Sequence, residues 1–216
     1  MRGRVRIDGR DHTRPDSTCG YVPQKYSLFP DKTVLDNITF GAEVHGRGVL
    51  TRFGPAKRRH LRQIRDRALG YLQRIGLHET DGRKYPHQLS GGMQQRVSIA
   101  QALMIKPRIL LMDEAFSALD PGTRRDMQKL IRDLWRDTGT TILFVTHNTE
   151  EALRLATRVI VLAKGEDNGG SGVGLDLAVS APCREEDLPR LIRRLETASE
   201  GERTHEQNTE VIYKVG

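Results

Sequence analysis

The stretch "HQLSGGMQQRVSIAQALMIKPRILLMDEAFSALD", His87 to Asp120, decides the fold. Its middle has apolar residues at helical spacing, and "RILLMDE" then forms a continuous apolar run that ends in two carboxylates. Such a run is typical of a strand that is buried on both faces. Ligands of parallel α/β sheets bind beyond the carboxyl ends of the strands. We therefore expect Asp113 and Glu114 at a ligand-binding edge.

Two more apolar runs follow, "TTILFVTH" at 140–147 and "RVIVLA" at 158–163. Between the first two strands, Asp120 is placed to cap a helix, Pro121 suits its first position and Gly139 its end. Apolar residues recur at helical spacing within this segment: Met127, Leu130, Ile131 and Leu134. The order strand, helix, strand, short helix, strand predicts right-handed crossovers and a parallel α/β sheet.

The segments on either side have different patterns. An amphipathic helix is predicted over 56–77, with one apolar face and arginines elsewhere. The apolar face consists of Leu61, Ile64, Ala68, Leu72 and Ile75. Residues 165–174 are typical of a turn or linker, and a strand at 175–181, a helix near 188–195 and a strand near 209–215 are expected after it. The predicted organisation is a core of 1–42 and 86–165, a helical subdomain of 43–85, and a linker and tail of 166–216.

"LSGG", Leu89 to Gly92, stands at the start of the predicted central helix. Ser90 is an N-cap candidate, and Gly91 and Gly92 let backbone N–H groups approach an anion at the positive end of the helix. Taken alone, these four residues fit a plain capped helix equally well. At the end of the apolar strand, one carboxylate can hold Mg²⁺ through water, and the next can orient or deprotonate an attacking water.

Composition narrows the class of protein only a little. The formal net charge of +7 suits a nucleic acid, an anionic membrane surface or a polyanionic ligand. The two cysteines, Cys19 and Cys183, fit no metal-ligand spacing and suit a reducing compartment. The sequence has neither a run of eighteen apolar residues nor a secretion signal after Met1. A cytosolic protein is expected.

Five motifs in order carry a family resemblance. They are "YVPQKYSLFPDKTVLDNITFG", "LSGGMQQR", "ILLMDE", "SALD" and "VTHN". This order resembles the nucleotide-binding subunit of an ABC transporter over nearly all of residues 3–164, with its glutamine loop, signature, Walker B strand, D-loop and switch histidine. The implied fold is an α/β P-loop NTPase core with a parallel sheet and a helical subdomain. Within the family, the motifs look most like importers of the nitrate, sulfonate and taurine group, and the basic insertion "HGRGVLTRFGPAKRRHL" resembles subunits of the urea-carboxylase-associated type.

The resemblance implies roles for particular residues. Gln24 would contact Mg²⁺ and the attacking water, Asp113 would anchor Mg²⁺, Glu114 would be the catalytic carboxylate, and His147 would contact the γ-phosphate of ATP. A second set would face the ATP of a partner subunit: Leu89, Ser90, Gly91, Gly92, Gln94 and Asp120. Without the flanking motifs, each of these residues also has a simpler interpretation. Gln24 could be an ordinary polar loop residue, His147 could be a structural histidine, and Asp120 could be a simple helix cap.

One motif of the family is missing. The phosphate loop G-x-x-x-x-G-K-[ST] needs a Gly-Lys dipeptide, and none occurs in the 216 residues. We expect the chain to lack the first strands, the phosphate loop and the helix behind it, to expose apolar sheet surface, and not to hold ATP in its own site. Two explanations are open, namely a start codon assigned inside a longer reading frame, which the intact Gln24, Glu114 and His147 favour, and a truncated or regulatory subunit.

The resemblance thus implies an ATP-binding and ATP-hydrolysing subunit that energises uptake of a small solute, with ATP and Mg²⁺ as cofactors. The implied partners are a second nucleotide-binding subunit, transmembrane permease subunits and, indirectly, a solute-binding protein, at the cytoplasmic face of the membrane and without nucleic acid. One alternative is a non-catalytic subunit that supplies "LSGG" to a partner with a phosphate loop. A DNA-repair ATPase of the same superfamily is another, but the chain has no sustained heptads for its coiled coil.

Overall fold

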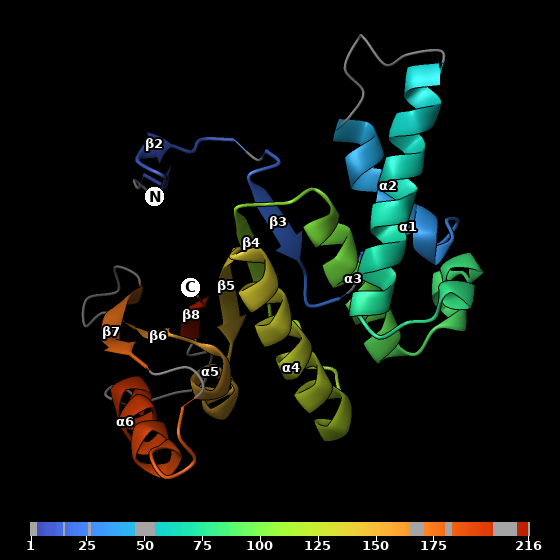
Figure 1. Cartoon of the computed structure of the whole chain (residues 1–216). Helices are drawn as coiled ribbons and strands as arrows, with labels where there is room; N and C mark the ends of the chain where they lie inside the picture. Colours follow the sequence, from blue (N-terminus) through green and yellow to red (C-terminus); the bar gives the residue numbers. More distant parts are fainter. Residues whose placement is uncertain are drawn as a thin grey trace.

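A six-stranded sheet forms the centre of the computed structural model, which describes residues 4–14, 16–25, 27–45, 55–164, 171–179, 183–200 and 211–215. The strands lie in the order β3 (Cys19–Val22), β4 (Ile109–Asp113), β5 (Thr141–Thr146), β8 (Val211–Val215), β6 (Arg158–Lys164) and β7 (Ser171–Ala178). A separate short hairpin pairs β1 (Arg6–Ile7) with β2 (Arg10–Asp11). Figure 1 shows the sheet and the helices around it.

The parallel sheet is confirmed for its first half. Strand β4 pairs in parallel with both β3 and β5. The C-terminal strand β8 lies between β5 and β6 and is antiparallel to each of them. Strands β5 and β6 therefore run in the same direction, as expected, but they are not neighbours. Strand β7 continues the second half as an antiparallel partner of β6.

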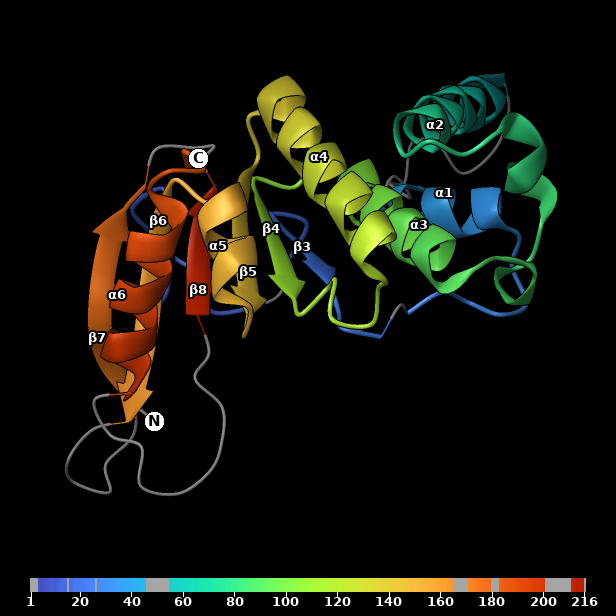
Figure 2. The ribbon, with the colours of Figure 1, turned by 90° about the horizontal axis from the view of Figure 1, so that it is seen from below.

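Burial alternates along the parallel strands because one face of the sheet carries the helices. In β4, Leu110 and Met112 are buried while Ile109 and Leu111 are half-exposed, and β5 repeats this alternation. Helices α4 (Pro121–Thr138), α5 (Thr149–Leu155) and α6 (Leu188–Glu200) lie over the sheet in Figures 1 and 2. The other face of the parallel strands is partly exposed, and Tyr21 of β3, at 56 % exposed, lies on it. The expectation that missing strands expose apolar sheet surface stays a prediction.

Helices α1 (Val34–His45), α2 (Pro55–Arg74) and α3 (Gly91–Met104) pack against one another beside the sheet (Figure 1). Two short 3₁₀ turns, Glu79–Arg83 and Pro86–Gln88, lead into α3. The apolar face predicted for α2 is buried from Ile64 onward, but Leu61 is 38 % exposed, because it lies in the first turns of the helix. The boundary predicted at residue 43 falls inside α1, and the division into domains stays a prediction.

The helix ends follow the local sequence signals. The Oγ of Ser90 accepts a hydrogen bond from the Met93 N–H, and Oδ1 of Asp120 accepts from the N–H groups of Gly122 and Thr123. Gly139 ends α4 in the left-handed conformation, with φ of 64°. These caps fix where α3 and α4 begin, and hence where the residues of the candidate site lie.

The tail is more regular than its composition predicts. Residues 171–174, expected within a linker, form the first half of β7. Residues 171–173 pair with β6, and the register shifts between Val161 and Leu162, where Gly174 has no partner. Residues 165–170 lie outside the described residues. Helix α6 and strand β8 confirm the expected helix and last strand. Of the helices in the described ranges, none is long and apolar enough to cross a membrane.

Candidate active site

Three of the predicted site residues meet at the carboxyl ends of the parallel strands. The Nε2 of Gln24 donates a hydrogen bond to Oε2 of Glu114 across 2.7 Å. The other carboxylate oxygen of Glu114, Oε1, lies 3.2 Å from Nδ1 of His147. Gln24 follows β3, Glu114 follows β4 and His147 follows β5, so three neighbouring strands each deliver one side chain to the same point.

The backbone at Glu114 has an unusual conformation. Its φ is +41°, in the left-handed region that a residue with a Cβ seldom adopts, and such a conformation costs on the order of 1–3 kcal/mol. A hydrogen bond from the Glu114 N–H to the Val145 carbonyl, 2.9 Å, holds the turn to β5. The turn directs the carboxylate toward Gln24 and His147, and the side chain remains 28 % exposed.

Asp113 has a partner that the sequence did not suggest. The hydroxyl of Tyr21 donates to Oδ2 of Asp113 across 3.2 Å, and Oδ1 accepts no hydrogen bond from the residues that the structure describes. Burial, and then the negative charge of Asp113, raise the pKa of Tyr21, so the phenol stays protonated and keeps donating. Tyr21 and Leu111 are paired neighbours in the parallel register, and only this register places the tyrosine beside Asp113.

The donor atoms around Asp113 and Glu114 fit a hard divalent cation. Mg²⁺ is bound by one or two carboxylates together with water and phosphate oxygens. Oδ1 of Asp113 is available, and Gln24 uses its amide nitrogen on Glu114, so that its carbonyl oxygen remains for a ligand. The described residues contain no group of three or more His, Cys, Asp or Glu side chains that would form a complete metal site. A cation here would depend on water and ligand oxygens for its remaining coordination.

The signature residues lie apart from this cluster. Ser90 is exposed at the start of α3, and no hydrogen bond among the described residues joins it, Gly91 or Gly92 to Glu114. Gln94 turns back and donates to the Leu89 carbonyl at 3.2 Å. A Cβ on Gly92 would stand 2.6 Å from Cγ2 of Thr123, so the beginnings of α3 and α4 touch at this glycine.

The loop between β4 and α4 is hydrogen-bonded at both of its ends. The Oγ of Ser117 donates to the Glu114 carbonyl at 3.0 Å and lies 3.4 Å from Nε2 of Gln24. At the end of the loop nearest α4, hydrogen bonds from Thr123, and then from Gly122, lower the pKa of Asp120. These bonds favour the ionised carboxylate as the N-cap of α4.

These motifs and this geometry agree with a comparison against protein-family models, in which the model described as "ABC transporter" matches residues 1–117. This chain belongs to the ABC transporter family. The fold is that of an ABC ATPase cassette, since a dimeric cassette solved in a post-hydrolysis state with ADP and phosphate superposes with a TM-score of 0.59. That cassette, MJ0796, is 33% identical, and the match covers 73% of this chain and 68% of the other.

Curated relatives in the family are import subunits. The taurine import ATP-binding protein TauB of Rhizobium johnstonii is 46% identical over 161 residues, which is 74% of this chain and 56% of TauB. A sulfate/thiosulfate import ATP-binding protein CysA of Rhizobium meliloti is 43% identical over 159 residues, covering 73% of this chain and 43% of CysA. The chain thus spans about half the length of the curated relatives that it matches.

Proposed function

We propose that this chain is an ATP-binding and ATP-hydrolysing subunit of an ABC importer, and that it energises uptake of a small solute of the nitrate, sulfonate or taurine type. The observation that carries the proposal is the position of Glu114 between Gln24 and His147. The names of the relatives TauB and CysA support the class of solute. The partners would be a second nucleotide-binding subunit, permease subunits and, indirectly, a solute-binding protein, at the cytoplasmic face of the membrane.

The contacts of each side chain suit a particular role in hydrolysis. Glu114 would accept a proton from the attacking water or orient it, and Gln24 would hold both the carboxylate and the water. His147 would donate to the γ-phosphate, which its 64 % exposed side chain is free to approach. Asp113, oriented by Tyr21, would hold Mg²⁺ together with Gln24. The cation would neutralise charge on the phosphate oxygens.

The test is ATP hydrolysis by the assembled transporter that contains this chain. We expect Glu114→Gln to lower turnover at least about 100-fold, because a positioned proton acceptor contributes about 10²–10⁴. Glu79→Gln is the matched control, since Glu79 is an exposed acid far along the chain in a 3₁₀ turn. Equal turnover of Glu114→Gln and Glu79→Gln would contradict a catalytic part for this carboxylate.

A second candidate is a subunit that only supplies its signature to a partner. It is favoured by the exposed Ser90, which has no bond to the Glu114 group among the described residues, and by the absence of a Gly-Lys dipeptide in the sequence. Losing four or five phosphate contacts at about 1.5–3 kcal/mol each removes about 6–15 kcal/mol, which is comparable with or larger than the roughly 8 kcal/mol of micromolar binding. We therefore expect the chain alone not to bind labelled ATP at micromolar concentration.

Two variants separate the candidates in one assembled complex. If this chain both hydrolyses ATP and supplies a signature, Glu114→Gln and Ser90→Arg each reduce turnover. If it only supplies the signature, Ser90→Arg abolishes turnover and Glu114→Gln leaves it unchanged. Micromolar binding and turnover of ATP by the isolated chain would refute the expectation that its own phosphate site is incomplete.

A further inference from the structure

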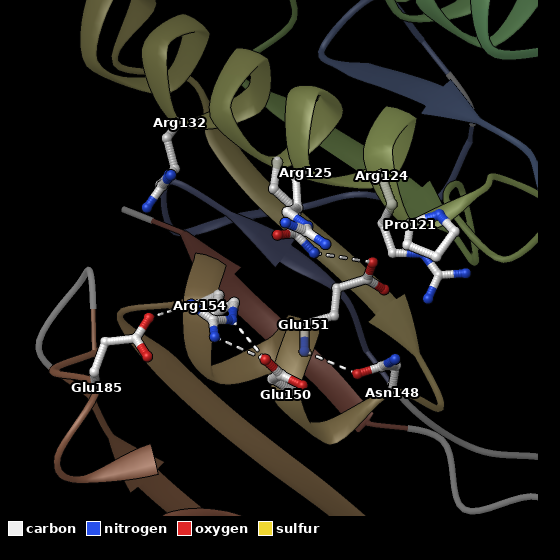
Figure 3. Close-up of a pocket in the computed structure, with 10 residues that line it drawn as sticks. Pro121, Arg124, Arg125, Arg132, Asn148, Glu150, Glu151, Arg154 and Glu185 are labelled. Atoms are coloured by element: carbon white, nitrogen blue, oxygen red, sulfur yellow. Dashed lines mark hydrogen bonds and ion pairs between the residues drawn. The ribbon is translucent and has the colours of Figure 1, made fainter.

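A cavity of about 600 Å³ opens between α4 and α5, outside the group formed by Gln24, Glu114 and His147. Figure 3 shows arginines on its α4 side and a mixture of glutamates and one arginine on its α5 side. The volume lies within the range of small-molecule sites, about 300–1,000 Å³. No motif of the family accounts for the charged side chains that line it.

The acidic side chains of the cavity already have partners. Arg154 binds Glu150 at 2.8 Å and Glu185 at 3.0 Å. Glu151 is buried and accepts a hydrogen bond from Nε2 of Gln128 at 3.5 Å. Burial raises the pKa of Glu151. One arginine thus serves two glutamates, so the α5 side stays acidic, and the four arginines of the cavity exceed its three glutamates by one.

The basic side chains of α4 are not balanced in this way. Arg125 and Arg132 lie seven residues apart, on nearly the same side of the helix, and the structure records no ion pair for either among the described residues. Arg124 donates through Nη2 to the Leu119 carbonyl, but its Nε is buried without a hydrogen-bond partner. Three guanidinium groups thus line one wall although three glutamates share the cavity.

We propose that the cavity between α4 and α5 binds a small phosphate-containing anion, of the size of pyrophosphate, chiefly through Arg125 and Arg132. Guanidinium groups match phosphate oxygens in bidentate geometry and keep their charge at any working pH. Arg124 adds a third positive charge to the same wall of the cavity. The proposal does not depend on the transport function, because none of these side chains contacts Glu114, Gln24 or His147.

The probe is inorganic pyrophosphate, titrated calorimetrically into the full chain at about 0.15 M salt, where exposed charges are screened beyond about 8 Å. Arg125→Gln combined with Arg132→Gln should raise Kd at least tenfold, which equals about 1.4 kcal/mol. Lys129→Gln combined with Arg136→Gln is the matched control, because both are exposed on the same helix and remove the same charge. We expect the control to stay within twofold of the unchanged chain.

Several results would overturn the proposal. These are the absence of binding by the unchanged chain, an equal loss in both double variants, and citrate binding as tightly as pyrophosphate with the same dependence on Arg125 and Arg132. Binding only to vesicles of anionic phospholipid would show a membrane surface instead of a small ligand. If the double variant does not fold, as judged by circular dichroism, Arg132→Gln alone should still weaken binding at least threefold, and an unchanged Kd would refute the proposal.

Discussion

Oε2 of Glu114 lies 2.7 Å from Nε2 of Gln24, although the two residues are ninety positions apart in the sequence. The bond joins the loop after β3 to the left-handed turn after β4, and His147 completes the group from β5. Because the glutamine donates its nitrogen here, its carbonyl oxygen is not used in this bond, and the Glu114 side chain remains 28 % exposed. The pair therefore sets the direction of the carboxylate before any ligand binds.

Removing this contact should slow hydrolysis more than it weakens binding. Gln24→Ala leaves the Glu114 carboxylate with His147 as its side-chain partner among the described residues, and misplacing a reacting group by about 1 Å can cost about 100-fold in rate. We expect kcat of the assembled transporter to fall about 10- to 100-fold, with a smaller change in KM for ATP. Gln73→Ala, on the exposed side of α2, is the control. If KM for ATP rises while kcat is unchanged, Gln24 does not position the carboxylate for hydrolysis.

Alanine substitutions at Gly92 and Gly70 should have opposite effects on stability, because only Gly92 lies at the contact between α3 and α4. In Gly92→Ala the new Cβ meets Cγ2 of Thr123 at 2.6 Å, so the helices must shift, and overpacking typically costs about 1–3 kcal/mol. Gly70→Ala in α2 meets no atom within 4 Å and should stabilise the chain by about 0.5–1 kcal/mol. Urea unfolding of both variants measures the difference.

Thr123→Ser provides the control for Gly92→Ala, since it removes only the methyl group Cγ2 and keeps the hydroxyl. Combined with Gly92→Ala, it should recover most of the lost free energy of unfolding. If the double variant is as unstable as Gly92→Ala alone, the close approach to Thr123 is not the reason that position 92 requires glycine.

Sequence reasoning was most successful where the signal is local. Ser90, Asp120 and Gly139 were predicted as helix ends, and their caps depend on atoms only two to four residues away. The buried faces of α3 and α4 follow from helical spacing in the same way. The joint position of Gln24, Glu114 and His147 came from the family resemblance, because no local pattern relates residues so far apart.

Features that depend on strand order were missed. Tyr21 reaches Asp113 only because β3 and β4 are paired in one register, and that register is set by the whole sheet. Strand β8 was predicted, but not its place between β5 and β6. Ser171 to Gly174 have the composition of a linker, yet Ser171, Gly172 and Val173 pair with β6, since the backbone of a strand is stabilised by its neighbour and not by its own side chains.

The buried Glu151 predicts a pH-dependent difference in stability. Burial raises its pKa above the ordinary value of 4.5, although hydrogen bonds from Thr146 and Gln128 and the charges of Arg124 and His147 act against the rise. The folded state therefore binds the proton more tightly than the unfolded state, and stability falls as pH rises from about 4.5 through the raised pKa. Glu151→Gln removes this loss and should be more stable than the unchanged chain at neutral pH.

The comparison is made by urea unfolding between pH 4.5 and pH 7.5. The advantage of Glu151→Gln should shrink as the pH falls, because the unchanged chain then carries a neutral Glu151 as well. Glu79→Gln, at an exposed position, is the control for a change of charge alone. An advantage of Glu151→Gln that is constant across the pH range would show that burial does not disfavour its charged form.

Strand β8 joins the two halves of the sheet, since it pairs with β5 at five positions and with β6 at four. Without it, the main-chain groups of Ile142–Thr146 and Arg158–Val161 lose these partners. With about one hydrogen bond for each of these nine positions and about 0.5–1.5 kcal/mol for each bond, deletion of Val211–Val215 should lower the free energy of unfolding by roughly 4–13 kcal/mol. Ile212→Pro, which removes a single donor in a central strand, should have a smaller effect in the same direction.

Hydrogen exchange can show whether deletion of β8 weakens only the strands that pair with it. In the deletion variant, amide protection should fall first in β5 and β6, because only these strands gain a free edge. Strands β3 and β4 keep their mutual pairing from Cys19↔Ile109 to Val22↔Met112, and their amides should stay protected. Equal loss of protection in all four strands would mean that the chain unfolds as one unit, and unchanged protection in β5 and β6 would mean that β8 does not hold the halves together.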